Sequence, residues 1–556
     1  MPEASVSGVS PAFIMEEVAL KNPILKNKAY LYLTEFFAGM SVMAVELGAS
    51  RLLAPYFSSS QIVWTIIIGT IMIAMALGNI MGGRWADKNP NPDKLYGRII
   101  IAAIWIALIP VAGKYIVIGI SALLVFTIST NFLVIAAFAA CMVVFVFPLF
   151  LLGTVTPSLV KYTVDSLSDS GKVVGYLNAS NTIGSIIGTF VPTFISIPAV
   201  GTSITFLIFA GILMLLAIIY FIAGKTKSVK AVAGAVIFIN SCILGHGDSF
   251  AFWEHGLTCE GESIYNNLHV YEDDTKVVLS TNVLFGVQSV YRKEKTLTGM
   301  YYDYAMAAPY MAGMKEKDRI DILILGMGTG TYATQCSRYF DNVSIEGVEI
   351  DQKITDLARE YFELPNDIKV TTYDGRAYLQ GLASSGDERK FDVIMVDAYQ
   401  DITIPFQMSS VEFFTLVKER LTDDGVMVVN MNMKSDGDRG INQYLGDTIC
   451  KVFDTVYTSD VQYSTNRELF ASNNPAMLER FRTGVETETD PELVQMMTKV
   501  EDGLIRYEGG SLILTDDKAP VELLGMSAID AIIREEVDYY KKIYDEKGFQ
   551  GVMEAF

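Results

Sequence analysis

The chain has 556 residues, carries a formal net charge of −20, and is 51% hydrophobic with a mean hydropathy of +0.33. So apolar a composition argues against a wholly soluble chain. The acidic charge argues against nucleic-acid binding, which needs Lys and Arg against phosphates. The five cysteines and three histidines show no spacing typical of a metal cluster or a disulfide framework.

The first half is predicted to be a membrane domain. Residues 1–29 lack the basic start of a cleaved signal peptide and are expected to be an N-terminal cytoplasmic segment. Residues 30–247 contain eight apolar stretches, several of about 20 residues, which is enough to cross a bilayer as a helix. Three are short, so we expect seven or eight membrane helices. The stretches are Tyr30–Ala49, Gln61–Gly82, Leu95–Ala112, Tyr115–Ser129, Asn131–Leu152, Val174–Ile197, Gly201–Ala223 and Val229–Gly245.

Charged and small residues stand out within this domain. Glu35, Glu46 and Arg51 lie in or beside the first helix, where they form either a functional site or charges that anchor the fold. Gly184 and Gly188 have the spacing that lets two helices approach closely, and we interpret them as packing residues. Around six helices would be half of a transporter of about twelve, and no second copy follows. A complete alternating-access transporter is therefore not expected.

The second half is predicted to be a soluble α/β region. Residues 248–319 should form a small β-rich lid or substrate subdomain, because apolar residues alternate along HVYEDDTKVVLSTNVLFGVQSVY and predict antiparallel strands over about 262–295. Residues 320–556 should form a Rossmann-like domain with a mostly parallel sheet and flanking helices. The fold class is thus a multi-pass helical membrane domain followed by an α/β domain.

The most informative segment runs from Ile322 to Asp351, ILILGMGTGTYATQCSRYFDNVSIEGVEID. A strand enters a turn that contains three glycines, and a second strand ends at Glu349, about 20 residues further on. Such turns let the backbone approach a nucleotide closely, and the acidic residue holds ribose hydroxyls. Asp374 and Gly375 are spaced to contact an adenine edge, and Asp397 follows the carboxyl end of another strand.

Five segments in this order resemble the spermidine synthase family over roughly Glu262 to Glu522: ESIYNNLHVYED, VLFGVQSVYRKEKTLTGMYYDYAMAAPYM, the two β-α-β halves and LTDDKAPVE. The membrane segments GASRLLAPYFSSSQIVWTIIIG and ALGNIMGGRWADK look like those of membrane-fused members. The resemblance implies a variant of the S-adenosylmethionine methyltransferase fold. It also implies aminopropyl transfer from decarboxylated S-adenosylmethionine to a polyamine such as putrescine.

The resemblance assigns roles to individual residues. Asp397 matches the catalytic proton acceptor, while Asp401 and Pro405 match the family's gate motif with a displacement of one residue. The residues implied to bind the donor are Asn266, Gly326, Gly328, Thr329, Gly330, Glu349, Asp351, Asp374, Gly375 and Pro405, and those implied to bind the acceptor are Gln288, Tyr302, Asp303 and Asp401.

Some positions depart from the family pattern. GMGTG stands where the family usually has GGGDG, so Thr329 replaces an aspartate that holds the amino end of the decarboxylated donor. Asn266 replaces a glutamine, and Tyr302-Asp303-Tyr304 stands in the place of Tyr-His-Glu. Loss of the acid removes attraction for an ammonium and also repulsion against the carboxylate of intact S-adenosylmethionine.

Three functions therefore remain open: a polyamine aminopropyltransferase, an S-adenosylmethionine methyltransferase that acts on a membrane-associated or exported small molecule, and a non-enzymatic transporter or sensor of polyamine or adenosyl ligands. The co-substrate is decarboxylated or intact S-adenosylmethionine, without a metal. The expected partners are a small cationic polyamine and the lipid bilayer, no nucleic acid, with a homodimer left open. We expect a multi-pass cell-membrane protein with a cytoplasmic catalytic domain, although its basic clusters give conflicting sidedness.

Overall fold

A computed structural model divides the chain into two compact units, which join in sequence between Trp253 and Glu254. The first unit is helical, and the second combines two sheets with helices. The structure describes residues 22–57, 59–125, 128, 131–163, 170–225, 229–246, 256–281, 287–294, 296–398, 404–432 and 439–555.

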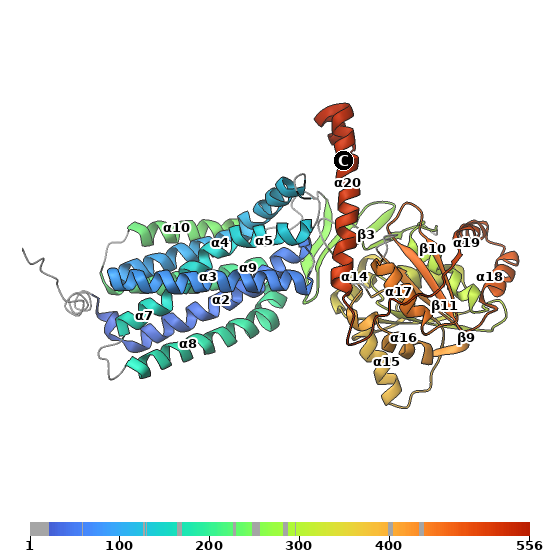
Figure 1. Cartoon of the computed structure of the whole chain (residues 1–556), viewed down its shortest axis with the longest axis horizontal. Helices are drawn as coiled ribbons and strands as arrows, with labels where there is room; N and C mark the ends of the chain where they lie inside the picture. The colour runs from blue at the N-terminus through green and yellow to red at the C-terminus, as the bar shows by residue number, and fades with distance from the viewer. Residues whose placement is uncertain are drawn as a thin grey trace, which may run out of the picture. The chain divides into compact units, whose positions relative to one another are not determined.

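The helical unit is a bundle in which the long helices lie along one another (Figure 1). Within the described residues of this unit, five helical segments are long and apolar enough to cross a membrane, and two shorter apolar helices accompany them. The described helices are η1 (Pro23–Lys26), α2 (Lys28–Phe57), α3 (Gln61–Lys88), α4 (Pro92–Val125), α5 (Phe132–Val144), α6 (Val146–Gly153), α7 (Val155–Thr163), α8 (Ser170–Val191), η3 (Pro192–Ser196), α9 (Ile197–Ala223) and α10 (Val229–Gly245).

Helix α4 corrects one part of the prediction. The stretches Leu95–Ala112 and Tyr115–Ser129 were expected as separate helices, but a single helix of 34 residues runs through both as far as Val125. Gly113 and Lys114 lie between the two stretches. In the structure Lys114 is a buried residue of α4, and its Nζ lies 5.3 Å from the centre of the Tyr115 ring.

The segment Ser170–Ala223 is 54 residues long, much longer than one bilayer crossing requires. It is interrupted by the π-helical η3 and by Gly201, whose φ of 80° is not helical. Both α8 and α9 pack against α2, so the chain reverses its direction between them. This segment therefore supplies two helices of the bundle.

Glycines set the contact between α2 and α8. A Cβ atom at Gly184 would lie 2.0 Å from the carbonyl oxygen of Phe36, and one at Gly188 would lie 2.1 Å from that of Met40. The two backbones are therefore in direct contact, as the spacing of small residues predicts. This geometry supports the interpretation of these glycines as packing residues.

Glu35 of α2 is buried within the same bundle. Its Oε1 accepts a hydrogen bond of 2.6 Å from Thr156 Oγ1 of α7 and one of 2.7 Å from Asn181 Nδ2 of α8. A charged group is costly inside a membrane unless polar groups solvate it. Two neighbouring helices provide that solvation here, so Glu35 ties three helices together.

The second unit begins with a four-stranded antiparallel sheet in the order β1-β2-β3-β4. The prediction of an antiparallel β-unit over about 262–295 is confirmed. Its apolar side chains pack with α14 in a small core of their own. The strands are β1 (Leu257–Glu262), β2 (Asn267–Glu272), β3 (Lys276–Ser280) and β4 (Ser289–Arg292).

An eight-stranded sheet forms the rest of the core, in the order β12-β10-β11-β9-β8-β5-β6-β7. The five strands from β9 to β7 are parallel, and β11, β10 and β12 add antiparallel partners at one edge. The predicted mostly parallel Rossmann-like sheet is confirmed. The strands are β5 (Ile320–Leu325), β6 (Val343–Glu349), β7 (Lys369–Thr372), β8 (Phe391–Val396), β9 (Leu421–Met431), β10 (Thr455–Asp460), β11 (Arg467–Ser472) and β12 (Ile505–Arg506).

Helices cover this sheet and supply its apolar core. Side chains of β5, β8, β9 and β11 share one buried cluster with residues of α11, α12, α13, α18 and α19. The helices are α11 (Tyr301–Ala305), α12 (Ala307–Met311), α13 (Thr331–Tyr339), α14 (Gln352–Tyr361), α15 (Gly375–Ser384), η4 (Phe406–Met408), α16 (Val411–Glu419), α17 (Ile441–Cys450), α18 (Met477–Glu486), α19 (Pro491–Gly503) and α20 (Val521–Ala555).

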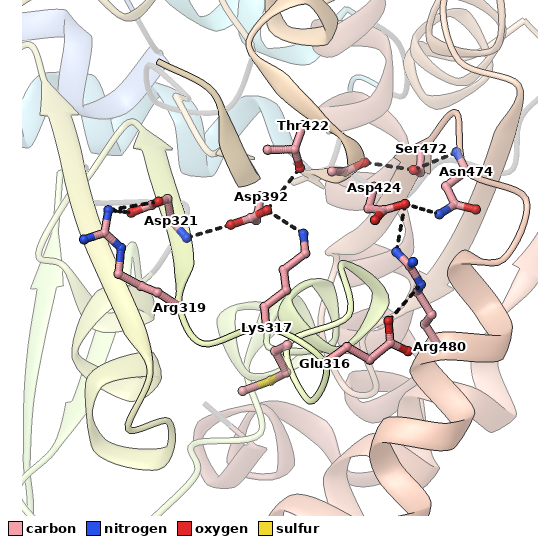
Figure 2. Close-up of polar contacts among 12 residues, drawn as sticks. Glu316, Lys317, Arg319, Asp321, Asp392, Thr422, Asp424, Ser472, Asn474 and Arg480 are labelled. Carbon is pink, nitrogen blue, oxygen red and sulfur yellow. Dashed lines mark hydrogen bonds and ion pairs between the residues drawn. The ribbon is translucent and has the colours of Figure 1, made fainter. Parts of the chain in front are cut away.

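The amino ends of the parallel strands carry a network of paired charges (Figure 2). Asp392 at the start of β8 accepts hydrogen bonds from Lys317 Nζ at 2.6 Å and from Thr422 Oγ1 at 3.1 Å. Asp424 of β9 lies 2.9 Å from Arg480 Nη1 of α18. These carboxylates have charged partners of their own, so they hold strands and helices together.

Candidate active site

A cavity of about 580 Å³ lies at the opposite end of this sheet, where the parallel strands end. Its floor comes from the turns after β5, β6, β7 and β8 and from the end of β9. Its walls come from segments distant in sequence, including Gln288 beside β4, Tyr301 of α11 and Ile529 of α20. Ligands of open α/β sheets bind at the carboxyl ends of the strands, so this cavity is the candidate site.

The turn between β5 and α13 brings bare backbone to the cavity. Gly326, Gly328 and Gly330 have φ angles of 89°, 55° and 75°, in the left-handed region. A Cβ atom at Gly326 would lie 2.4 Å from the carbonyl oxygen of Asp397, and one at Gly330 would lie 2.5 Å from Leu364 Cδ1. Glycine suits both the backbone conformation and the space. Gly326 and Gly328 line the cavity.

Glu349 ends β6 and contacts this turn. Its Oε2 accepts a hydrogen bond of 2.8 Å from the backbone N–H of Gly328, and its Oε1 accepts one of 3.0 Å from that of Asp351. Burial raises the pKa of Glu349 above its ordinary value, although these amides stabilise the charge. Each oxygen has a further lone pair, so Glu349 can still accept hydrogen bonds from ribose hydroxyls.

Asp374 follows β7 and is the N-cap of α15. Its side chain accepts a hydrogen bond of 2.8 Å from the backbone N–H of Ala377. Asp374 and Gly375 both line the cavity. The cap uses one carboxylate oxygen, which leaves the other able to accept a hydrogen bond from a nucleobase amine.

Asp351 connects the small sheet to the large one. It caps α14, and its Oδ2 accepts hydrogen bonds of 2.5 Å from Ser263 Oγ and 3.1 Å from Asn266 Nδ2. Asn266 lines the cavity but Asp351 does not. The geometry therefore makes Asp351 a residue that positions Asn266 rather than one that contacts a ligand.

Asp397 follows β8 and lies among polar side chains at the centre of the cavity floor. Its Oδ2 accepts a hydrogen bond of 2.7 Å from the Tyr301 hydroxyl, and its Oδ1 accepts one of 2.9 Å from Asn430 Nδ2. Burial raises the pKa of Asp397 to about 7, although both hydrogen bonds oppose the rise. A group with this pKa can accept a proton at neutral pH and release it again.

Carboxamides continue the network behind Asp397. Asn466 Nδ2 donates a hydrogen bond of 2.8 Å to Asn430 Oδ1, and Asn430, Asn432 and Asn466 all line the cavity. We did not predict these residues from the sequence. Asn430 at the end of the apolar run of β9, with Asn432 two residues further on, is the signal that could have identified them.

The described residues that line the cavity include three carboxylates, Glu349, Asp374 and Asp397, and no Lys, Arg or His. No group of three His, Cys, Asp or Glu side chains that could hold a metal occurs in the described part of the chain. The acidic lining is therefore suited to a positively charged ligand. It offers no basic side chain to a negatively charged ligand.

The structure brings most of the predicted site residues together. The predicted residue Asp401 lies outside the described residues. Those that line the cavity are Asn266, Gln288, Tyr302, Gly326, Gly328, Glu349, Asp374, Gly375, Asp397 and Pro405.

The tyrosine pair in α11 changes the predicted assignment. The hydroxyl of Tyr302 donates a hydrogen bond of 2.7 Å to the carbonyl oxygen of Val290, so it is bound to backbone. The neighbouring Tyr301, which we had not selected, donates to Asp397. Both tyrosines line the cavity, and Tyr301 is the one whose hydroxyl contacts Asp397.

Asp303, which the resemblance implied to bind the acceptor, does not line the cavity. Its Oδ2 accepts hydrogen bonds of 2.6 Å from the backbone N–H groups of Thr298 and Gly299 and one of 2.8 Å from Thr298 Oγ1. Burial raises the pKa of Asp303 to about 6 despite these donors. The side chain holds the loop before α11.

Thr329 and Gly330 also lie outside the cavity lining. Thr329 is buried, and its Oγ1 lies 3.1 Å from Thr331 Oγ1. Its hydroxyl is thus engaged within the glycine turn. Gly330 contributes through its backbone conformation, which starts α13.

Comparisons with known proteins agree with this geometry. Residues 303–465 match the model of the spermine/spermidine synthase domain. A probable polyamine aminopropyl transferase of Bifidobacterium longum (strain NCC 2705) is 52% identical over 355 residues, which are 61% of this chain and 78% of that protein. A polyamine aminopropyltransferase of Vibrio vulnificus (strain CMCP6) is 25% identical over 294 residues, which are 50% of this chain and 93% of that one.

Two further comparisons concern a methyltransferase and a solved structure. The eEF1A lysine and N-terminal methyltransferase of Homo sapiens is 28% identical over 163 residues, 28% of this chain and only 23% of that protein. A spermidine synthase in complex with the transition-state analogue AdoDATO is 21% identical, with a TM-score of 0.34, and the match covers 42% of this chain and 77% of that one. The extent and identity of the Bifidobacterium match decide the assignment: the chain belongs to the polyamine aminopropyltransferase family of transferases.

Proposed function

We propose that this protein is a membrane-bound enzyme that transfers an aminopropyl group from decarboxylated S-adenosylmethionine to a polyamine such as putrescine. The observation that carries this proposal is the position of Asp397. It lies in a cavity lined by three carboxylates and no basic residue, and it accepts hydrogen bonds from Tyr301 and Asn430. Both substrates of the proposed reaction are cations.

In this mechanism the chain's own residues bind the substrates and move one proton. Glu349 accepts hydrogen bonds from the ribose hydroxyls and Asp374 from the adenine edge. Asp397 takes a proton from the attacking ammonium, and Tyr301 and Asn430 hold its carboxylate in place. The amine lone pair then forms a bond to the carbon beside the sulfonium. The carbon–sulfur bond breaks, its electron pair goes to sulfur, and neutral methylthioadenosine leaves.

The charge of the cavity also supports the decarboxylated donor. Intact S-adenosylmethionine carries a carboxylate, which would meet three carboxylates and no basic residue among the described lining. An uncompensated negative charge in such a cavity costs binding energy. The decarboxylated donor lacks that group and carries only positive charge, so it fits the same surface without repulsion.

A methyltransferase remains the second candidate because of Thr329. Its hydroxyl is engaged with Thr331 and neither attracts an ammonium nor repels a carboxylate. The human methyltransferase relative is 28% identical over 163 residues of this chain. A non-enzymatic transporter or sensor has less support, because it gives no role to a buried aspartate with a pKa of about 7.

We propose that the five long apolar helical segments and the two shorter apolar helices found among the described residues embed the enzyme in the cell membrane. The catalytic unit then lies in the cytosol, where S-adenosyl compounds are made. The bilayer and a cationic amine are the partners that this arrangement requires.

Calorimetry of the full-length protein in detergent tests the proposed donor. Decarboxylated and intact S-adenosylmethionine are titrated separately in the same buffer. We expect the decarboxylated form to bind more tightly, because only the intact form brings a carboxylate to the acidic cavity. Tighter binding of intact S-adenosylmethionine would contradict the proposed donor and favour the methyltransferase.

A further inference from the structure

Glu468, in β11, is a carboxyl group that the mechanism above does not use. It has no exposed surface, and neither of its carboxyl oxygens has a hydrogen-bond partner among the described residues. Buried carboxylates normally have donors or a cation beside them. An orphaned carboxyl at this position therefore requires an explanation.

The strand register places Glu468 behind the wall of the active site. It is the Cα partner of Asn430 in the antiparallel pair of β11 and β9. Directly opposed residues share a face of the sheet, as do residues two apart in a strand. Glu468 therefore lies on the same face as Asn430, which donates a hydrogen bond to Asp397 and accepts one from Asn466, just before β11.

Among the described residues, no Lys or Arg forms a hydrogen bond with Glu468. Its neighbours on this face include Phe470 of β11 and Val428 of β9, which belong to the apolar core. The groups that interact electrostatically with Glu468 are Asp397 after β8, Tyr301 of α11 and Tyr332 of α13, and its strand partners are Ser459 of β10 and Asn430 of β9. The other titratable groups of the two helices are Tyr302, Asp303 and Tyr304 of α11 and Cys336, Arg338 and Tyr339 of α13.

Glu468 therefore keeps its proton in the free enzyme. Burial, and after it the negative charge of Asp397, raises the pKa of Glu468 well above its ordinary value. Of the two carboxyl groups, Asp397 ionises more readily, because Tyr301 and Asn430 donate hydrogen bonds that stabilise its carboxylate. The two carboxyl groups thus titrate as a coupled pair, and near neutral pH the pair carries at most one negative charge.

We propose that Glu468 is a positioning residue of the aminopropyl transfer: it holds a proton in the empty enzyme and releases that proton to solvent when cationic substrate fills the cavity. This proposal rests on the proposed function. A diamine brings an ammonium at each end, and the decarboxylated donor brings a sulfonium and an ammonium. Three carboxylates line the described cavity, so ionisation of Glu468 supplies a further negative charge behind Asn430.

The release conserves atoms and charge. The O–H bond of Glu468 breaks, its electron pair stays on the carboxylate, and the proton goes to bulk solvent. The carboxylate that forms is stabilised by the substrate cations across Asn430 and Asp397. When methylthioadenosine and the product leave, the cavity loses that positive charge and Glu468 takes a proton again.

Proton counting by calorimetry tests the proposal. Putrescine is titrated into full-length protein that is saturated with methylthioadenosine, at about pH 8, in buffers of different ionisation enthalpy. No reaction takes place, and the heats give the number of protons released on binding. Glu468→Gln has the shape of the neutral acid but no proton to lose. We expect the wild type to release more protons than Glu468→Gln, by up to about one per site.

A matched control distinguishes the loss of the Glu468 carboxyl group from the loss of any other carboxyl group. Glu346→Gln removes a carboxylate of β6 that is paired with Lys369 and Arg389 and does not line the cavity. It should release as many protons as the wild type. Equal proton counts in the wild type and Glu468→Gln would overturn the proposal, as would the same deficit in Glu346→Gln.

The pH dependence of unfolding tests the protonated state independently of activity. Above about pH 4.3, the ordinary pKa of Glu, an unfolded chain loses this proton while the folded chain keeps it. The unfolding equilibrium constant of the wild type should therefore rise tenfold per pH unit relative to that of Glu468→Gln. A constant difference from pH 5 to pH 7.5 would contradict the buried proton. Inactivity of the wild type with the decarboxylated donor would instead contradict only the proposed function.

Discussion

The two ends of the large sheet carry the same type of side chain in opposite electrostatic settings. At the amino ends, Asp392 and Asp424 are bound by Lys317 and Arg480 (Figure 2). Although partial burial opposes ionisation, the Arg480 guanidinium holds the pKa of Asp424 below its ordinary value. At the carboxyl ends, burial raises the pKa of Asp397 to about 7, and no cation among the described lining residues lowers it.

This difference indicates that the active site lies at the carboxyl ends of the strands. A carboxylate that is paired within the fold has its charge compensated before any ligand arrives, so it contributes to stability. A carboxylate that has no cation beside it in the fold remains uncompensated, so it can attract a cationic ligand. The same substitution, Asp to Asn, should therefore reduce activity at one end and stability at the other.

The largest expected effect is on Asp397. Asp397→Asn keeps the shape and the hydrogen bond from Tyr301 but loses the ability to take a proton. Turnover should fall by about 10²–10⁴, the usual range for a positioned acid–base group. Steady-state kinetics with putrescine and the decarboxylated donor measures this change. Donor affinity should stay close to that of the wild type, and wild-type turnover would remove Asp397 from the mechanism.

Glu349 gives the next largest effect, on donor binding. Glu349→Ala removes the charged acceptor beneath the glycine turn, which also holds the backbone N–H of Gly328. Hydrogen bonds to charged groups contribute about 1.5–3 kcal/mol, so donor affinity should fall roughly tenfold to a hundredfold. Calorimetry with the donor measures it, and circular dichroism checks the fold. Unchanged affinity in a folded variant would refute the donor site.

Replacement of Tyr301 should change the pH dependence of kcat/KM rather than its maximum value. Because Asp397 must be ionised to accept a proton, kcat/KM of the wild type should fall tenfold per pH unit below about pH 7. Tyr301→Phe removes a hydrogen bond that stabilises the carboxylate, so the pKa rises and the acid limb should move to higher pH by roughly one unit. Tyr302→Phe is the matched control, because Tyr302 bonds to Val290. An equal shift in both variants would contradict the assignment.

The smallest effect is expected at the amino end. Asp424→Asn breaks the ion pair with Arg480, which is partly exposed, so the free energy of unfolding should fall by only about 1 kcal/mol. Turnover should not change, because Asp424 lies far from the cavity lining. Chemical denaturation and kinetics of the same preparation measure both quantities. A loss of turnover comparable to that of Asp397→Asn would break the contrast between the two ends.

The donor side of the site could be predicted because its residues follow local rules. A strand, a glycine turn and an acidic residue at the next strand end specify Gly326, Gly328 and Glu349 within one short segment. The parallel order of the strands then brings Asp374 and Asp397 to the same edge. The alternation of apolar residues was likewise enough to predict the small antiparallel sheet.

The rest could not be read from local pattern, because it depends on contacts between distant segments. Tyr301 and Tyr302 are adjacent tyrosines, and only the packing of α11 decides which hydroxyl reaches Asp397. The Asn430–Asn466 bond depends on the pairing of β9 with β11. In the helical unit, the expected separation of Leu95–Ala112 from Tyr115–Ser129 does not occur, because a charged residue such as Lys114 can remain inside a continuous helix when it is packed.

The most direct test of the account offers both donors to the enzyme at once. Purified full-length protein is incubated with putrescine and equal amounts of decarboxylated and intact S-adenosylmethionine, and the products are identified by mass spectrometry. The account predicts methylthioadenosine together with an amine that has gained an aminopropyl group, and neither product with Asp397→Asn. S-adenosylhomocysteine with a methylated acceptor would contradict it.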